Sequence, residues 1–171
     1  MSNKKSLIAL TAFIFTGFLG VSAANAQNPN QQCYTLASLQ GTYAVIGNYG
    51  SNLAIAFGVR YFDGNGNLTA SYLTNEPTPG STTGARTIVS GTQVGTYTVN
   101  CNGTGVINRV LTQANGTVSN GVDDFIITGG AVQAGQLLAA NIMDAQRTPS
   151  AIVAGGVFLV RTYTRMPDFF Y

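Results

Sequence analysis

The chain has 171 residues, no histidine and only 8% charged residues, with eight basic side chains against six acidic ones. Without histidine it lacks the base of Ser-His-Asp and Cys-His catalysis, and two cysteines cannot complete a Cys/His zinc site. Its small positive charge forms no basic stripe, which argues against a nucleic-acid surface. We therefore expect no metal, no cofactor and no nucleic-acid partner.

Residues 1–26 have the pattern of a secretory signal peptide. Lys4 and Lys5 precede an apolar stretch, and an Ala-Asn-Ala cleavage site ends at Ala26. Cleavage removes both lysines, which leaves six arginines against six acidic residues, so we expect a mature charge of about zero. No later apolar run reaches the roughly 18 residues of a helical membrane span.

The predicted destination is the periplasm or the extracellular medium. An outer-membrane barrel is the less favoured alternative, because Pro167 breaks the last predicted strand and several runs are shorter than a bilayer requires. We predict an N-terminal leader over residues 27–40, with one short helical turn between Cys33 and Leu39. Cys33 and Cys101 are the only cysteines, and in an exported chain an even count predicts a disulfide between them.

The predicted barrel domain covers residues 41–171, with a C-terminal tail from about residue 165. Apolar and β-branched runs alternate there with glycine and asparagine turns, at a spacing typical of β-sandwiches and barrels. Asn-Gly and Asp-Gly pairs suit the tight turns of antiparallel hairpins, and no helical crossover for parallel strands is visible. The longest connector, residues 75–84, is predicted to be an open loop. The expected strands are Gly41–Asn48, Leu53–Phe62, Asn67–Thr74, Ala85–Ser90 continuing as Gln93–Asn100, Thr104–Gln113, Gly121–Thr128, Gln136–Asp144 and Ile152–Thr164.

The two faces of the run Leu53–Phe62 favour a closed sheet. Its odd positions are bulky and apolar, whereas its even positions are mostly alanine and glycine, as the narrow interior of a small barrel requires. Closure would also remove exposed strand edges, which a chain with so few charges cannot otherwise protect. We predict an all-β fold: a single antiparallel eight-stranded up-and-down barrel of the calycin-like or lipocalin-like kind, with a two-sheet sandwich as the alternative.

Two segments carry a resemblance to known proteins. The run from Tyr61 to Thr69, YFDGNGNLT, and the run from Gly95 to Gly105, GTYTVNCNGTG, resemble a group of small exported bacterial proteins with an FDGxGxLT hairpin. The likeness covers about residues 33–111 and implies a β-barrel rather than an activity, because most members of the group are uncharacterised. The second run is more distantly similar to allene oxide cyclase and dirigent-type barrels, which bind or steer a small molecule in an apolar lumen.

Charged residues within apolar strands are the main candidates for a site. A buried guanidinium requires a carboxylate or an anionic ligand. Asp63 lies close to the first candidate arginine in sequence, and either Asp123 or Asp124 could pair with the last. Adjacent strand residues point to opposite faces, so only one of these two carboxylates can face the lumen. The arginines concerned are Arg60, Arg109 and Arg161.

Tyrosines complete the candidate site, because each offers an aromatic wall with a hydroxyl group. We interpret Asp63 and the asparagines after it as turn residues rather than as a calcium loop, since the EF-hand positions that follow do not match. No catalytic residue is assigned. The candidate ligand-binding residues are Arg60, Tyr61, Tyr72, Tyr97, Arg109, Asp123 and Arg161.

The favoured function is an exported β-barrel, more plausibly non-enzymatic, that binds a small apolar or amphipathic molecule in its lumen. One alternative is a structural or interaction module of the envelope or matrix that self-associates through an apolar outer face. The other is a cofactor-free isomerase or cyclase of the allene oxide cyclase or dirigent type. A lumen that binds such a molecule needs a cavity of roughly 300 Å³.

Overall fold

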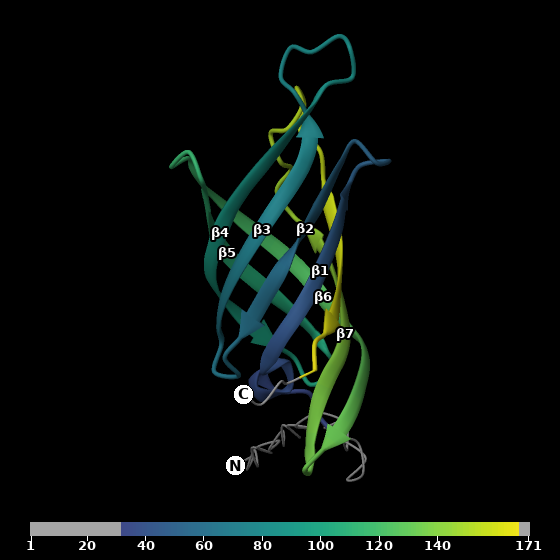
Figure 1. The fold of residues 1–171 in the computed structure, drawn as a ribbon. Coiled ribbons are helices and arrows are strands. Elements are labelled where there is room, and N and C mark those ends of the chain that lie inside the picture. The colour runs from purple at the N-terminus through teal and green to yellow at the C-terminus, as the bar shows by residue number, and fades with distance from the viewer. Residues whose placement is uncertain (1–31, 168–171) are drawn as a thin grey trace, which may run out of the picture. The chain divides into compact units, whose positions relative to one another are not determined.

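The barrel closes by hydrogen bonding between its first and last strands. A computed structural model describes residues 32–167 of the chain (Figure 1). Eight antiparallel strands follow one another in sequence order around the barrel, and β8 pairs with β1. The predicted up-and-down barrel is therefore confirmed, and the two-sheet sandwich is wrong. The predicted signal peptide and residues 27–31 and 168–171 lie outside the described residues.

Most observed elements match the predicted runs, including a short 3₁₀ helix, η1, in the leader. The predicted last strand is wrong in its first half, because β8 begins at Leu159 rather than at Ile152. Gly155 and Gly156 have positive φ values, and a bridge between Ser150 and Val157 folds this segment into a loop. The elements are η1(Leu36–Leu39), β1(Gly41–Tyr49), β2(Ala54–Phe62), β3(Asn67–Pro77), β4(Arg86–Val99), β5(Thr104–Gln113), β6(Val118–Gln133), β7(Gln136–Gln146) and β8(Leu159–Arg165).

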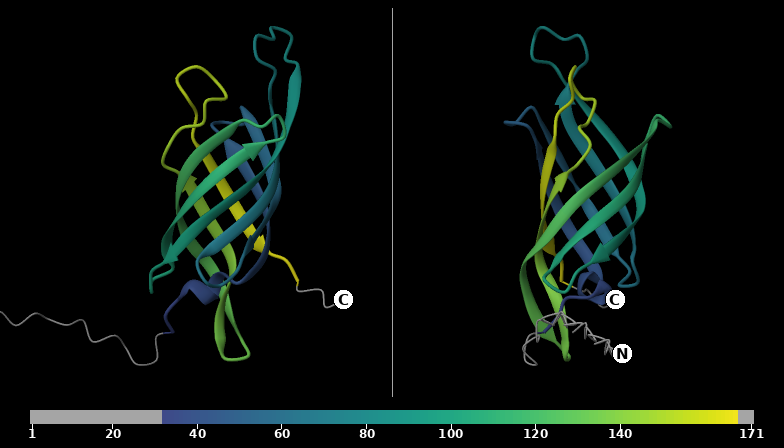
Figure 2. Two further views of the ribbon diagram at one scale, coloured as in Figure 1. Left: turned by 90° about the vertical axis from the view of Figure 1, so that its left-hand side faces the viewer. Right: turned by 180° about the vertical axis from the view of Figure 1, so that it is seen from behind.

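The two ends of the barrel differ in their connections. The β1–β2, β3–β4, β5–β6 and β7–β8 connections lie at one end, which we call the loop end (Figures 1 and 2). The other end, which we call the terminal end, holds η1, the end of β8 and the remaining three turns (Figures 1 and 2). The open loop predicted over residues 75–84 is shorter than expected, since β3 continues to Pro77 and pairs there with Arg86.

The turn between β4 and β5 shows how local chemistry fixes strand pairing. Gly103 has φ of +85°, and its amide donates to the Asn100 carbonyl at 2.9 Å. The Asn102 side chain accepts the Thr104 amide at 3.1 Å. Glycine reaches this left-handed conformation without the steric cost that a Cβ imposes. The turn therefore sets the register of β4 against β5, and with it the inward faces of both strands.

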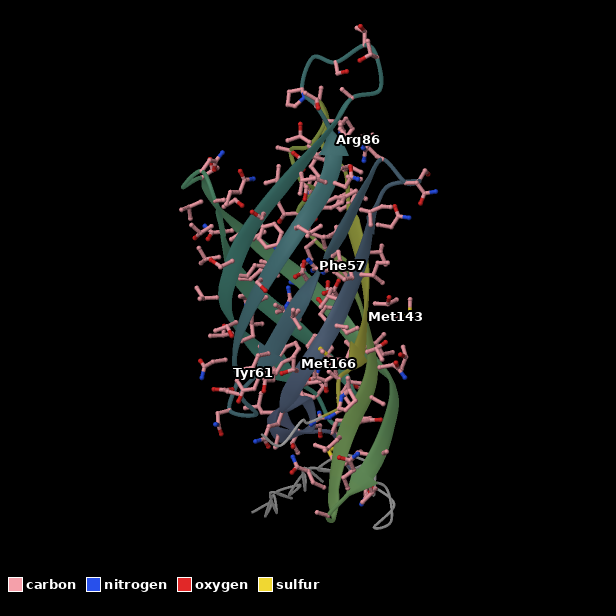
Figure 3. The ribbon with its side chains drawn as sticks, viewed as in Figure 1. Phe57, Tyr61, Arg86, Met143 and Met166 are labelled. Atoms are coloured by element: carbon pink, nitrogen blue, oxygen red, sulfur yellow. A yellow bond between two sulfur atoms is a disulfide. The ribbon has the colours of Figure 1, made fainter. Side chains whose placement is uncertain are left out.

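The side-chain pattern of β2 has the orientation that a narrow barrel requires. Ala54 and Ala56 face the lumen and are buried, whereas Phe57 and Tyr61 point outward and are 58% and 46% exposed (Figure 3). Small inward residues leave space between the walls of the barrel. The bulky residues of the same strand lie on its outer surface.

A large apolar cluster fills the terminal end. Its aromatic members include Tyr43, Phe62 and Tyr97, which stack edge to face at 5.5 and 5.0 Å between ring centroids. The helix η1 covers this end, since the Tyr97 hydroxyl donates to the Leu36 carbonyl at 3.0 Å. The predicted disulfide between Cys33 and Cys101 is present and joins this cover to the barrel.

A smaller apolar cluster lies toward the loop end. It consists of Tyr49, Ala54, Ala56 and Leu159, against which the partly buried Ile152 and Val157 of the β7–β8 loop pack. The β7–β8 loop thus covers the lumen along β1, β2 and β8. The wall formed by β3, β4 and β5 has no such cover in this cluster.

Candidate functional site

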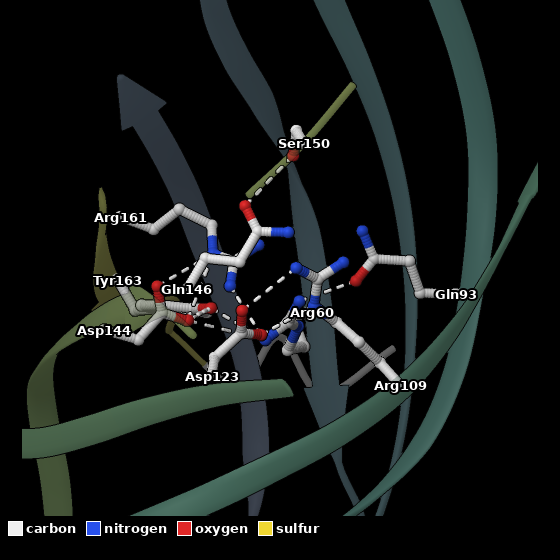
Figure 4. A network of polar contacts seen from close by, with 9 residues as sticks. All are labelled: Arg60, Gln93, Arg109, Asp123, Asp144, Gln146, Ser150, Arg161 and Tyr163. Atoms are coloured by element: carbon white, nitrogen blue, oxygen red, sulfur yellow. Dashed lines mark hydrogen bonds and ion pairs between the residues drawn. The ribbon is translucent and has the colours of Figure 1, made fainter. Parts of the chain in front are cut away.

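A layer of charged side chains crosses the lumen between the two apolar clusters. The inward residues of β8 show its position, because Leu159 belongs to the loop-end cluster, Tyr163 belongs to the terminal-end cluster, and Arg161 lies between them. The charged side chains of this layer come from β2, β5, β6, β7 and β8, and Gln93 of β4 lies beside them (Figure 4). Its charged members are each 3% exposed or less: Arg60, Arg109, Asp123, Asp144 and Arg161.

Asp123 joins two of the arginines. Arg109 donates to both of its carboxylate oxygens, at 2.6 and 2.9 Å, and Arg161 Nη2 lies 2.6 Å from Oδ2. Burial alone raises the pKa of the Asp123 carboxyl, but the Arg109 hydrogen bonds and the nearby guanidinium charges outweigh it and bring the pKa below its ordinary value. Asp123 is therefore a structural anion within the layer.

Asp144 is the second buried carboxylate. Arg161 Nε donates to its two oxygens at 2.9 and 3.0 Å, and the Tyr163 hydroxyl also donates to it. Burial raises the pKa of Tyr163 well above its ordinary value, so the phenol keeps its proton. Within residues 32–167, the hydrogen-bond donors to the Asp144 carboxylate, Arg161 and Tyr163, both lie on β8.

Arg60 is less well paired than the other two arginines. Its Nη1 donates to the Tyr163 hydroxyl at 2.7 Å and its Nη2 to Gln93 Oε1 at 2.6 Å, both neutral acceptors. Asp144, the carboxylate paired with it, lies 3.9 Å away. Arg60 Nε is buried and has no hydrogen-bond partner among residues 32–167. Burial lowers the pKa of Arg60 from its ordinary value, which marks a cation that lacks full compensation.

The charges of this layer do not balance. Three guanidinium groups face two carboxylates, so the fully buried charges of this layer sum to one net positive charge. Transferring an unpaired charge from water into a protein interior costs several kcal/mol. An anion bound beside Arg60 would remove that cost.

A small cavity adjoins the charged layer. Its free volume is about 30 Å³, enough for roughly two water molecules or one small anionic group. This is about a tenth of the space that a whole small molecule needs, so most of the lumen is filled by side chains. Its inward-facing lining residues are Val45, Tyr49, Ala56, Gly58, Arg60, Ala70, Tyr72, Gln93, Arg109, Leu111, Leu159 and Arg161.

The structure brings together five of the seven predicted site residues. Arg60, Arg109, Asp123 and Arg161 share the charged layer, and Tyr72 lines the cavity beside it. The other two predicted residues, both tyrosines, lie elsewhere. Tyr61 is exposed on the outer face of β2, and Tyr97 is buried in the terminal-end cluster, where its pKa is raised to about 12 by burial.

Two predicted partners of the arginines need correction. Asp63 does not pair with Arg60, because its carboxylate accepts the amides of Asn65 and Asn67 at 2.7 and 2.9 Å and stabilises the β2–β3 turn. Asp124 does not pair with Arg161. It lies on the outer face of β6 and binds Arg147 at 2.5 Å, with both side chains 53% exposed.

Three members of the layer were missed from the sequence. Asp144, Gln93 and Tyr163 each lie at an inward position, and Asp144 follows the buried apolar Ile142 at a spacing of two, as a strand facing the lumen requires. That periodicity could have placed Asp144 in the lumen. No sequence pattern could have assigned its partners, because they depend on strand register.

Comparisons with protein-family models, curated proteins and solved structures find no match for this chain. Among residues 32–167, no three or more histidine, cysteine, aspartate or glutamate side chains are grouped to hold a metal ion. The same residues include no helix long and apolar enough to cross a membrane. The candidate site therefore rests on the geometry of the charged layer.

Proposed function

We propose that the barrel binds a small anionic group in its lumen, beside Arg60. The observation that carries this proposal is the buried charge imbalance next to a cavity of about 30 Å³. Arg60 lines that cavity and has a buried Nε without a hydrogen-bond partner among the described residues. This proposal narrows the class of lumen ligand expected from the sequence, because the cavity admits an anionic group more readily than a whole apolar molecule.

The neighbouring groups favour binding rather than catalysis. Both buried carboxylates accept hydrogen bonds from arginines, and the Tyr163 hydroxyl donates to one of them. A general base near this cavity would need a free carboxylate with a pKa close to the working pH. The pKa of Asp123 is instead lowered by its arginine partners. We therefore propose a binding protein.

Arg60→Met tests the proposal. Removing Arg60 leaves two guanidinium groups and two carboxylates in the layer, so this variant should fold, with an apolar side chain of similar length in its place. We expect sodium acetate to raise the midpoint of thermal unfolding of the native protein in a saturable manner, because a ligand that binds only the folded state stabilises it. The variant should lose the saturable part of this increase in the unfolding midpoint. Circular dichroism during heating measures both.

Arg86→Gln is the matched control. Arg86 is exposed near the loop end (Figure 3) and donates to the Asn75 and Leu53 carbonyls, so its loss changes the net charge equally without touching the lumen. The control should respond to acetate as the native protein does. Equal responses of the native protein and Arg60→Met would contradict the proposal.

A further inference from the structure

The charge of the layer limits the ligand to one negative charge. Asp123 and Asp144 are already present, and a monoanion would make the layer neutral. A dianion, such as sulfate or the doubly charged form of phosphate, would reverse the imbalance rather than remove it. Like charges in a low-dielectric interior repel strongly, so the site favours a carboxylate or a halide over a phosphate.

The cavity wall indicates that the anion carries an apolar part. Apart from the arginines and Gln93, the inward-facing lining is aliphatic, aromatic or glycine. An inorganic anion gains nothing from apolar walls, whereas a hydrocarbon chain gains free energy from each methylene that leaves water. The lining therefore suits an amphipathic molecule with one acidic end.

Burial shows on which side the cavity approaches solvent. Along β1, β2 and β8, the lining residues Tyr49, Ala56 and Leu159 are 8% exposed or less, and the β7–β8 loop covers them. Along β3 and β5, the lining residues Tyr72 and Leu111 are only half-buried. The route between the charged layer and solvent therefore passes Tyr72 and Leu111.

Tyr72 limits the length of this route. It lies directly opposite Gly91 in the β3–β4 pair. A Cβ on Gly91 would lie 2.9 Å from the Tyr72 hydroxyl, so the missing side chain of Gly91 makes room for the phenol. With Tyr72 in this position the free volume is about 30 Å³. A chain of more than a few carbons can extend outward only where Tyr72 moves or is absent.

We infer that the ligand is an organic monocarboxylate whose acid group binds beside Arg60 and whose chain extends past Tyr72, which sets the chain length accepted. This inference rests on the proposed anion site and adds the chemical class of the ligand and a residue that determines specificity. Tyr72 belongs to neither apolar cluster, so its replacement should leave the fold intact.

The test compares the native protein with Tyr72→Ala in calorimetric titrations with chloride, acetate, butyrate, hexanoate and octanoate. Each buried methylene is worth about a fourfold gain in affinity. In the native protein we expect affinity to increase with chain length only up to about butyrate. In Tyr72→Ala the increase should continue through hexanoate.

Tyr61→Ala provides the matched control, since it removes the same side chain from the outer face of β2 (Figure 3). It should reproduce the native dependence on chain length. Chloride and acetate binding with no gain from longer chains in either protein would overturn this inference and leave the anion site intact. An equal gain in the native protein and Tyr72→Ala would also overturn it, whereas failure of every anion to bind would refute the proposed function itself.

Discussion

Replacing Asp123 by asparagine is expected to lower the free energy of unfolding by about 3–5 kcal/mol. Asp123 is 0% exposed. Its carboxylate accepts hydrogen bonds from Arg109 and forms an ion pair with Arg161. Its neutralisation leaves two buried guanidinium groups with a weaker acceptor and raises the net positive charge of the layer from one to two. Urea denaturation followed by circular dichroism measures the loss.

Asp124→Asn is the matched control, because it makes the same chemical change one residue along the same strand. Asp124 lies on the outer face and pairs with Arg147, both half-exposed, and exposed ion pairs contribute about 0–1 kcal/mol. The two variants should therefore differ by at least about 2 kcal/mol. Similar losses in the two variants would show that the lumen layer does not hold the charges that the structure assigns to it.

Replacing Cys33 and Cys101 together by serine is expected to cost about 4 kcal/mol. The disulfide spans a sequence separation of 68 residues, and its removal restores chain entropy to the unfolded state. The loss should also weaken the cover of the terminal end, where η1 lies against the apolar cluster. Urea denaturation of the double variant beside the native protein gives the value.

Tyr97→Phe separates the disulfide from one of the hydrogen bonds that join η1 to the barrel. This variant loses only the hydrogen bond from the Tyr97 hydroxyl to the Leu36 carbonyl, and such a bond is worth about 1 kcal/mol. A double-serine variant no less stable than Tyr97→Phe would mean that the leader contributes little to the folded barrel.

Much of the fold could be predicted because its signals are local. Alternation along a strand and Asn-Gly or Asp-Gly turns act over a few residues, and they predicted antiparallel hairpins in sequence order. The closed barrel followed from the small inward face of β2. The predicted start of β8 was wrong because the apolar residues Ile152 and Val157 do not belong to a strand. They lie in the β7–β8 loop and pack against the loop-end cluster.

The site could be predicted only in part, because its members come from strands far apart in sequence. Alternation placed Arg60 in the lumen and required that only one of Asp123 and Asp124 face it. The same rule excludes Tyr61 from the lumen, since it follows Arg60 directly and must face the other way. The pairing of Arg60 with Tyr163 and Gln93 joins three strands and depends on register and packing, which no local pattern encodes.

The volume of the cavity could not be predicted from the sequence either. Small residues such as Ala56 and Gly58 indicated space within the barrel, but Tyr72 and Leu111 extend into the same region and reduce the free volume to about 30 Å³. Free volume depends on how side chains from different strands interdigitate. A pattern along one strand cannot supply that information.

The most direct test of the buried, anion-binding guanidinium is the nuclear magnetic resonance signal of its Nε–H group. Arginine Nε resonances would be followed in ¹H–¹⁵N spectra during titration with sodium acetate, and the Arg60 signal would be assigned by its absence from the Arg60→Met spectrum. We predict that the Arg60 signal shifts and saturates, while the signal of the exposed Arg86 changes little. An Arg60 signal that stays in place while acetate reaches high concentration would contradict an anion site in the barrel.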